Sequence, residues 1–461
     1  MLVKQFVDAD LGNSSYLIVS EETGLAAVLD PQRDVDRYLR VAEGLGLRLV
    51  YALDTHLHND FVSGARELAT QAGVQIGASA EAELGFEHLP LRDGSAIPLG
   101  DLSIGVLSTP GHTPEHISFS LTESRSEVPS ALFTGGALMV GGAARTDLLG
   151  DDLAEPLAGR LYHSIHDKLL QFPDNIAVHP THGAGSFCAA PAVSERSTTI
   201  GQERSWNPLV QAKEERDFVS LALDGLPSYP TYFKYLRRVN QEGPRLLGGV
   251  PVLELLSPEE VRRGMAGPVA VLDARSPHQF AAGHIPGSFG IPLAAPLVTW
   301  AGWVIPFGTP LILISANPAE REEAIRQLIR IGYDDLRGYL EGGISAWEAA
   351  GLPLAQVPRM PVEELARRLE RAGAPVVIDV RFDSEWRAGH IPGALHIEAG
   401  RLPAVDLPLP LDQLTVVHCG HADRTAVGIS LLERRGYRNL ALLEGGMSSW
   451  RSADYPIEKD E

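Results

Sequence analysis

The sequence predicts a multidomain chain of α/β and α+β class, with an αββα sandwich first and two smaller α/β units after it. Three observations lead to this prediction: a length of 461 residues, histidine loops between strand-like segments in the front part, and a unit that occurs twice in the back part. A chain of this length is enough for two to four domains, each with its own core. The hydrophobic fraction of 44% and the charged fraction of 21% are those of ordinary globular protein.

The front part alternates apolar strand-like runs with helix-like segments. Strands are expected at 15–20, 25–30, 47–53, 102–109, 116–121 and 130–135. Helices are expected at 35–45, 62–72 and 157–171, and a proline-interrupted helical segment at 206–246. Strands flanked by helices in two similar halves predict an αββα sandwich with the histidine loops on one rim. We expect this domain to span residues 1–246.

A run of metal-ligand side chains follows the expected strand at 47–53. His56, His58 and Asp60 stand at positions i, i+2 and i+4, so in extended backbone they leave from one face. Imidazole nitrogen and carboxylate oxygen suit zinc, iron or manganese. A histidine-rich turn without metal is the alternative interpretation of this run.

Two later loops add one histidine each. His112 and His182 both stand in loops bracketed by glycine and proline, which predicts a metal site built from three loops. Cys188 follows His182 by six residues, across glycines that let the backbone pass close to a ligand. It is either a buried, small apolar cysteine or an auxiliary thiol near the metal pocket that carries a persulfide.

The back part contains one unit twice, about a hundred residues apart. Each copy alternates buried strands with helices that end at glycine, which predicts a small α/β domain with a parallel sheet. We expect the first copy to span residues 250–353 and the second to span 360–457. The matching segments are 271–275 with 377–381, 280–288 with 386–394, and 341–347 with 444–450.

The second copy carries a candidate nucleophile. Cys419 follows an apolar strand-like run, and a helix is expected to begin near Arg424. Backbone N–H groups of residues 420–425, the positive end of the helix dipole and the guanidinium would favour the thiolate and hold an anionic sulfur donor. A structural cysteine is the alternative.

The first copy has Ala316 at the position that matches Cys419, so it lacks a nucleophile. We expect this copy to be inert and to serve as a docking or structural module. His284 and His390 stand in the same GHIPG motif of the two copies. Because the inert copy also has this histidine, we expect a structural hydrogen-bonding role for both.

The front segments DTHLHNDFVSG, STPGHTPEHISF and VHPTHGAGSFC resemble the metallo-β-lactamase superfamily. Within it they look most like the persulfide dioxygenases, with glyoxalase II as the nearer hydrolase relative. The resemblance implies a mononuclear iron, held by His56, His112 and an aspartate, that binds a thiol persulfide and O₂ and forms sulfite. The chain departs from the family at two positions: Phe61 replaces a histidine that would bind a second metal, and Gly136 replaces the ligating aspartate.

Three outcomes stay open for this site. His56, His58 and His112 hold one Fe(II) or Zn(II) ion per chain, with His182 and Asp60 on the second side. Alternatively, Asp60 substitutes for the missing carboxylate. In the third outcome the site holds metal weakly or not at all, and the domain is a scaffold.

The GHIPG and EGG-x-x-x-W motifs of both copies resemble rhodanese (sulfurtransferase) domains nearly end to end. The resemblance implies that the second copy is active, with Cys419 and Arg424 as its catalytic residues. The loop that binds the substrate would comprise Gly420, His421, Ala422, Asp423 and Thr425.

We therefore expect an enzyme of hydrogen sulfide and sulfur metabolism. A persulfide dioxygenase-like oxidoreductase domain would be coupled to a rhodanese that carries sulfane sulfur as a Cys419 persulfide. The expected partners are a small thiol persulfide and thiosulfate, and a homo-oligomer stays open. One alternative is a sulfurtransferase or sulfur-relay protein whose metal domain is a degenerate scaffold. A thioester hydrolase of the glyoxalase II kind is less favoured.

Charge and cysteine content narrow the class further. A net charge of -20 and a pI near 5.2 argue against binding to nucleic acid or anionic membranes. No segment has the length of a membrane span, and the N-terminal residues do not form a signal peptide. Two cysteines far apart in sequence exclude a disulfide framework, so a cytoplasmic location is expected.

Overall fold

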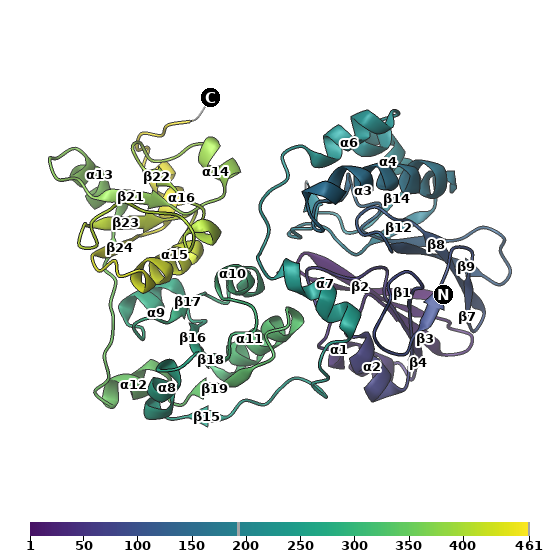
Figure 1. Ribbon diagram of the computed structural model, residues 1–461, viewed down its shortest axis with the longest axis horizontal. Helices are drawn as coiled ribbons and strands as arrows, with labels where there is room; N and C mark the ends of the chain where they lie inside the picture. The colour runs from purple at the N-terminus through teal and green to yellow at the C-terminus, as the bar shows by residue number, and fades with distance from the viewer. Residues whose placement is uncertain (191–193, 460–461) are drawn as a thin grey trace. The chain divides into compact units, whose positions relative to one another are not determined.

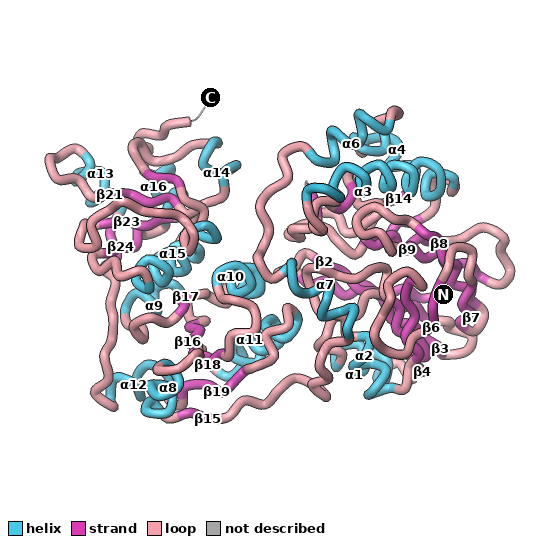
Figure 2. Tube along the Cα trace, in the orientation of Figure 1, coloured by secondary structure: helices cyan, strands magenta, loops and turns pink. Residues whose placement is uncertain are grey.

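The computed structural model describes residues 1–190 and 194–459, which form two compact units (Figure 1). The front unit comprises Met1–Pro251 and the short segment Ile329–Gly332, and the back unit comprises the rest of the chain from Val252. Figure 2 shows that each unit mixes strands with helices. Within the described residues, no helix is both long enough and apolar enough to cross a bilayer.

The first sheet of the front unit has six strands that lie in sequence order. They are β1 (Leu2–Asp8), β2 (Asn13–Val19), β3 (Leu25–Leu29), β4 (Arg48–Leu53), β5 (Gln75–Ser79) and β6 (Leu89–Leu91). β1 to β3 pair antiparallel, and β3 to β6 pair parallel. Helices α1 (Asp36–Gly44) and α2 (Ala65–Ala72) cover one face, where Tyr38 and Leu68 pack on Leu17 and Val28.

The second sheet also has six strands, and most of its pairs are antiparallel. In spatial order they are β14 (Thr198–Thr199), β12 (Ala177–Pro180), β10 (Ala131–Gly135), β9 (Ile117–Glu123), β8 (Leu102–Ser108) and β7 (Ala96–Leu99). The pair β10 and β12 is parallel. A short antiparallel pair, β11 (Ala143–Ala144) with β13 (Ala189–Ala190), lies outside this sheet.

Helices cover the outer face of the second sheet. Leu161, Ile200 and Phe218 pack there against Leu132 and Val178 of the strands. The helices of this part are α3 (Asp151–His163), α4 (Ile200–Trp206), α5 (Pro208–Gln211) and α6 (Glu215–Leu223). Helix α7 (Phe233–Glu242) lies instead on the loop after β4, where the Asn240 side chain donates to the carbonyl oxygens of His58 and Phe61.

The two sheets pack face to face on one apolar core. Tyr16 and Leu53 of the first sheet share this core with Phe119 and Phe133 of the second. The Tyr16 and Phe133 rings meet edge to face with centroids 5.2 Å apart. With helices on both outer faces, this arrangement confirms the predicted αββα sandwich.

One helix differs from its prediction. The sequence suggests a helix over 157–171, but α3 begins at Asp151 and contains Pro156. The carboxylates of Asp151 and Asp152 lie in its first turn, where the helix dipole favours negative charge. The predicted end is divided into a π turn, η1 (Ser164–Lys168), and a 3₁₀ turn, η2 (Leu169–Gln171).

The back unit holds two sheets with the same topology, as the repeat predicts. In spatial order the first is β15 (Leu255–Leu256), β19 (Leu336–Leu340), β18 (Leu311–Ile314), β16 (Ala270–Asp273) and β17 (Phe289–Gly290). The second is β20 (Arg359–Met360), β24 (Leu440–Leu443), β23 (Thr415–His418), β21 (Val376–Asp379) and β22 (Leu395–His396). All pairs in both sheets are parallel.

Helices surround each of these parallel sheets. The first repeat has α8 (Pro258–Met265), α9 (Pro277–Ala282), α10 (Leu297–Val304), α11 (Pro318–Arg330) and α12 (Gly343–Ala349). The second has α13 (Val362–Leu369), α14 (Asp383–Arg387), the 3₁₀ turn η3 (Ala399–Arg401), α15 (Asp423–Arg434) and α16 (Gly446–Ser452). Trp347 and Trp450 occupy matching places in the two cores.

The histidines of the two GHIPG motifs have structural contacts, as expected. The His284 ring stacks on Phe280 at 3.8 Å and its Nδ1 lies 2.9 Å from the Phe280 carbonyl oxygen. The His390 ring stacks on Trp386 at 3.5 Å, with its Nδ1 3.2 Å from that residue's carbonyl oxygen. These contacts fix the turn that follows α9 or α14, in agreement with a structural role for both histidines.

Candidate functional site

The histidine loops of the front unit meet at one rim of the sandwich. His56 and His58 follow β4, His112 follows β8, and His182 follows β12. Gly136 follows β10 in the same second sheet. All four histidines are buried, so the loops pack closely around these rings.

Three of these imidazoles converge. His56, His112 and His182 each offer a ring nitrogen, and these atoms lie within 4.8 Å of one another. The Nε2 atoms of His56 and His182 are 3.4 Å apart. The centroids of the His56 and His112 rings are 4.8 Å apart. This group is a set of metal-ligand side chains assembled from three separate loops.

The other nitrogen of each ring is held by a neighbour. His56 Nδ1 lies 2.8 Å from the Thr55 hydroxyl oxygen, and His182 Nδ1 lies 3.0 Å from Asn13 Oδ1. His112 Nδ1 donates to the Arg145 carbonyl oxygen at 2.7 Å. Metal-binding histidines in proteins are oriented by such partners.

One ring nitrogen in the group, the buried Nε2 of His112, is left without a hydrogen bond by the described part of the chain. Burial of the rings, together with the neighbouring imidazoles, lowers the pKa of His112 to about 3 and that of His56 well below its usual range. Neutral imidazole is the form that binds a metal, so the residues fit a cation held by three histidines.

His58 lies in a second group of possible ligands, with Asp60 and His182, whose ligand atoms are within 4.8 Å of one another. Its Nε2 lies 3.2 Å from Asp30 Oδ1, and the Phe61 ring stacks on it at 4.0 Å. Its buried Nδ1 has no hydrogen-bond partner among the described residues, so its place in the expected ligand set stays a prediction. The sequence reasoning missed Asp30, although an aspartate at the end of an expected strand is a usable signal.

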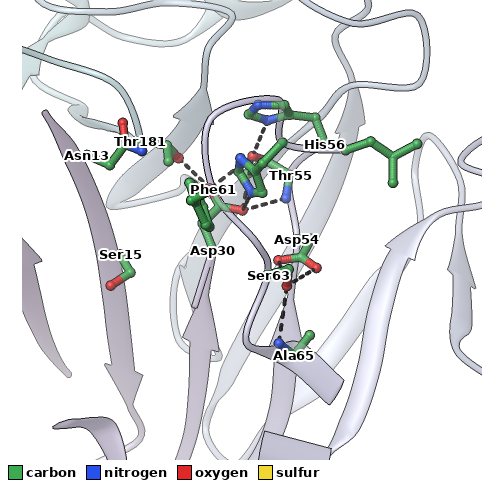
Figure 3. A network of polar contacts seen from close by, with 12 residues as sticks. Asn13, Ser15, Asp30, Asp54, Thr55, His56, Phe61, Ser63, Ala65 and Thr181 are labelled. Atoms are coloured by element: carbon green, nitrogen blue, oxygen red, sulfur yellow. Dashed lines mark hydrogen bonds and ion pairs between the residues drawn. The ribbon is translucent and has the colours of Figure 1, made fainter. Parts of the chain in front are cut away.

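Asp30 is the anchor beneath the histidine loop. Figure 3 shows it in polar contact with Thr55 and Thr181 from two different loops. It also accepts the Thr55 backbone N–H at 2.7 Å. Burial alone would raise the pKa of Asp30, but the facing His58 and these donors hold it below its usual value. The carboxylate therefore stays ionised and fixes the loop.

Gly136 leaves no room for the carboxylate that the family resemblance implies. A Cβ there would lie 2.7 Å from His112 Cδ2 and 2.9 Å from Ala144 Cβ. The backbone N–H of Gly136 donates to His116 Nε2 at 3.0 Å. His116 is a buried histidine that the sequence reasoning missed, four residues after His112. The residues present thus fit three imidazoles and do not fit two imidazoles plus a carboxylate at position 136.

Asp60 and Cys188 lie on the far side of His182. Asp60 Oδ2 accepts the Asn13 side-chain N–H at 2.8 Å and lies 3.4 Å from His182 Nδ1. Its buried Oδ1 has no hydrogen-bond partner among the described residues. Burial and the negative charge of Asp60 raise the pKa of the fully buried Cys188 thiol well above its usual range. Cys188 is therefore a protonated thiol beside the pocket.

Cys419 lies at the base of the loop between β23 and α15. Its side chain is only 2% exposed, so it is less accessible than the expected reactive thiolate. Within the described part of the chain, the backbone N–H groups of residues 420–424 donate to no protein acceptor. The N–H groups of Thr425 and Ala426, by contrast, donate to the Ala422 carbonyl. Five consecutive donors of the loop are thus free, as the expected cradle around the sulfur requires.

The Arg424 side chain is held beside this cradle. Its Nη2 donates to Glu385 Oε1 at 2.8 Å, and its Nη1 donates to the other carboxylate oxygen. The guanidinium carbon lies 5.3 Å from the centre of the Phe382 ring. Burial of the guanidinium acts to lower the pKa of Arg424, but the hydrogen bonds to Glu385 and the interaction with Cys419 outweigh it and raise that pKa. Neither Phe382 nor Glu385 could be assigned from sequence, because both lie far from the cysteine along the chain.

The other loop residues have modest contacts. His421 is exposed, and its Nε2 lies 3.2 Å from the Ser448 hydroxyl. Asp423 begins α15, and the buried Thr425 hydroxyl has no hydrogen-bond partner among the described residues.

The first repeat lacks both the thiol and the cradle. Ala316 stands at the cysteine position, and Pro318, which has no N–H, begins α11. The Asn317 side chain accepts the Glu320 N–H at 2.9 Å, and its carbonyl accepts the Arg321 N–H at 3.1 Å. Three of the five donors that stay free around Cys419 are therefore absent or occupied at the matching positions here, those of Pro318, Glu320 and Arg321.

Comparisons with known proteins agree with this architecture. The rhodanese-like domain family matches residues 257–350 and 361–453. The chain is 30% identical over 214 residues to human persulfide dioxygenase ETHE1. The aligned region covers 45% of this chain and 75% of that protein. It is 32% identical over 209 residues to hydroxyacylglutathione hydrolase GloC of Haemophilus influenzae, covering 41% of this chain and 88% of that protein.

A solved structure is similar over most of the chain. The metallo-beta-lactamase from Staphylococcus aureus subsp. aureus COL is 32% identical with a TM-score of 0.65, covering 74% of this chain and 98% of that one. Fold and site thus define a metallo-β-lactamase-like domain joined to two rhodanese-like domains. The chain belongs to the family of metallo-β-lactamase-fold proteins that includes ETHE1, and this combination identifies an enzyme of sulfur metabolism.

Proposed function

We propose that the back unit is a sulfurtransferase in which Cys419 carries one sulfane sulfur atom as a persulfide. The Cys419 thiolate attacks the outer sulfur of thiosulfate. A new S–S bond forms at the cysteine, the S–S bond of thiosulfate breaks, and sulfite leaves with the electron pair. An acceptor nucleophile, cyanide or a thiolate, then attacks the outer sulfur of the persulfide, and the Cys419 thiolate is the leaving group.

The observation that carries this proposal is the set of free N–H groups at residues 420–424. They stand at the start of α15, where the helix dipole also favours negative charge. Such donors can hold thiosulfate oxygens, stabilise the thiolate and stabilise the persulfide anion. The nearly buried sulfur suits a small inorganic donor.

Thiocyanate formation from thiosulfate and cyanide tests the proposal. Cys419→Ser should abolish it, whereas Cys188→Ser should retain it, because Cys188 lies in the other unit. Activity that persists in Cys419→Ser would refute the assignment.

For the front unit we propose one divalent ion, Fe(II) or Zn(II), held by His56, His112 and His182, and a thiol persulfide as substrate. Such an ion, when bound, would supply a Lewis-acid centre with open positions. Thr55, Asn13 and the Arg145 carbonyl orient the three rings. Asp60 supplies an anionic oxygen beside them, because His182 holds the pKa of its carboxyl below the usual range in spite of burial.

The absence of a carboxylate at Gly136 favours a second candidate, in which the front unit is a scaffold for the sulfurtransferase. Elemental analysis of the purified protein, combined with oxygen uptake in the presence of glutathione persulfide, separates the two. Iron with oxygen uptake supports a persulfide dioxygenase. Absence of metal with undiminished thiocyanate formation supports the scaffold, and zinc with thioester cleavage supports a glyoxalase II-like hydrolase.

The proposal includes the domain limits 1–246, 250–353 and 360–457. It also includes a reducing, cytoplasmic setting, because both cysteines are unpaired thiols.

A further inference from the structure

Helix α10 of the first repeat is buried along its whole length, although that repeat has no nucleophile. Its two tryptophans, Trp300 and Trp303, are 3% and 6% exposed. A helix that is apolar on all sides needs partners on all sides. One of these partners is η3 of the second repeat, where a Cβ on Gly400 would lie 2.3 Å from Trp303 Nε1. Only glycine allows the indole to approach the second repeat so closely.

An aromatic stack leads from α10 towards the cysteine loop. The Trp300 and Trp303 rings stack with centroids 5.5 Å apart. Phe382 of the second repeat lies 5.9 Å from Trp300 and 6.1 Å from Trp303. These spacings are those of favourable aromatic pairs. The Arg424 guanidinium lies over the same Phe382 ring, within the range of a cation–π contact.

The groups that hold Arg424 occur only in the repeat that has the cysteine. At the positions of Phe382 and Glu385 the first repeat has Ser276 and Gln279, which form the N-cap of α9. The matching arginine, Arg321, lies instead over the Tyr339 ring at 3.6 Å. In this chain the ring and the carboxylate thus occur in the repeat that has the nucleophile and are absent from the described repeat that lacks it.

We propose that the inert first repeat positions the Arg424 guanidinium beside the Cys419 loop, through Trp300 and Trp303 stacked on Phe382, and thereby favours anionic sulfur donors. Two of the five guanidinium N–H groups donate to Glu385. The other three can donate hydrogen bonds to an anionic substrate such as thiosulfate. The guanidinium is also close to the loop backbone, since a Cβ on Gly420 would lie 3.5 Å from Arg424 Nη2. Trp300, Trp303 and Phe382 are positioning residues, and the inference rests on the proposed role of Cys419.

Alkylation of Cys419 in the full chain measures this effect directly. Iodoacetate is an anion and iodoacetamide is neutral, so the ratio of their rate constants reports the positive charge at the thiol. Trp303→Leu should lower this ratio by about threefold to tenfold, the equivalent of losing one well-placed cation contact. Trp303→Phe keeps a ring against Phe382 and should largely restore the ratio. Peptide mapping assigns the label to Cys419 and not to Cys188.

A matched control and a second variant keep the test decisive. Trp347→Leu makes the same change in the core of the first repeat, away from Phe382, and should leave the ratio unchanged. Phe382→Leu keeps an apolar side chain but removes the ring under Arg424, so it should lower the ratio even if Trp303→Leu does not fold.

Different results would refute the positioning role of the first repeat and the proposed sulfur transfer by Cys419. An unchanged ratio in folded Phe382→Leu, or an equal fall in Trp347→Leu, would overturn the positioning role and leave sulfur transfer intact. Thiocyanate formation that persists in Cys419→Ser would instead overturn the proposed function on which the inference rests.

Discussion

Replacement of Gly446 by alanine should reduce sulfur transfer by Cys419, because it displaces the loop that holds this residue. Replacement of Gly343, the matching glycine of the first repeat, should leave sulfur transfer unchanged. Gly446 has φ +54°, and a Cβ there would lie 2.3 Å from the Cys419 carbonyl oxygen and 3.0 Å from that of Gly420. Gly343, its counterpart, has φ +60° but a Cβ that meets nothing within 4 Å. The pair therefore shares the same backbone conformation and differs in the contact with the loop.

The backbone conformation and the contact with the loop together set the expected loss of stability and activity. Alanine in the left-handed region destabilises by about 1–2 kcal/mol, which applies to both variants. The overlap with the loop adds about 1–3 kcal/mol in Gly446→Ala alone, because close-packed backbone can relax only in part. The overlap also displaces the carbonyl groups that accept the Met447 and Ser448 N–H groups. A shift of this kind near a reacting sulfur should reduce kcat/KM for thiosulfate by about a hundredfold.

Tryptophan fluorescence during urea unfolding measures the stability term. Five of the six tryptophans lie in the back unit, and only Trp206 lies outside it, so the signal reports mainly the unit that carries both changes. Thiocyanate formation measures the activity term. Equal losses of activity in Gly446→Ala and Gly343→Ala, or full activity in Gly446→Ala, would refute the reasoning.

Three further changes test other parts of the structure. Asn13→Ala should weaken metal binding by about tenfold to a hundredfold, measured by competition with a chelator, because His182 loses its orienting partner; unchanged affinity would contradict the proposed ligand set. Gly136→Asp should produce no oxygen uptake with glutathione persulfide, because its Cβ collides with His112; dioxygenase activity in this variant would show that the pocket can relax. Ala316→Cys in a Cys419→Ser background should form no thiocyanate, since Pro318 and Asn317 remove the N–H cradle; recovered activity would show that the cradle is dispensable.

The fold could be predicted because its signals are local or repeated. The apolar run at 15–20 overlaps β2, and the run at 47–53 contains β4. The matching motifs of the back part predict two sheets with one topology. The start of α3 could not be placed, because Pro156 resembles a helix boundary while the first-turn carboxylates that favour an earlier start give a weaker signal.

The candidate ligands could be predicted from short local motifs, including His112 and His182 in their glycine and proline loops, but the contacts among them could not. The spacing in the histidine run identified His56 and the loop of Cys419 identified its N–H donors. The contacts of His58 with Asp30 and with the stacked Phe61 could not be predicted, because they depend on the three-dimensional fold. For the same reason Glu385 and Phe382 become visible as partners of Arg424 only when β21 lies beside β23.

The release of sulfite in a single turnover tests the role of Cys419 most directly. When the protein is mixed with thiosulfate and no acceptor, each chain should release one equivalent of sulfite, and the peptide that contains Cys419 should gain the mass of one sulfur atom. Cys188→Ser should behave in the same way, and Cys419→Ser should release none. Sulfite release from Cys419→Ser, or a sulfur atom found on Cys188 instead, would contradict the proposal that the cradle of residues 420–424 holds the persulfide.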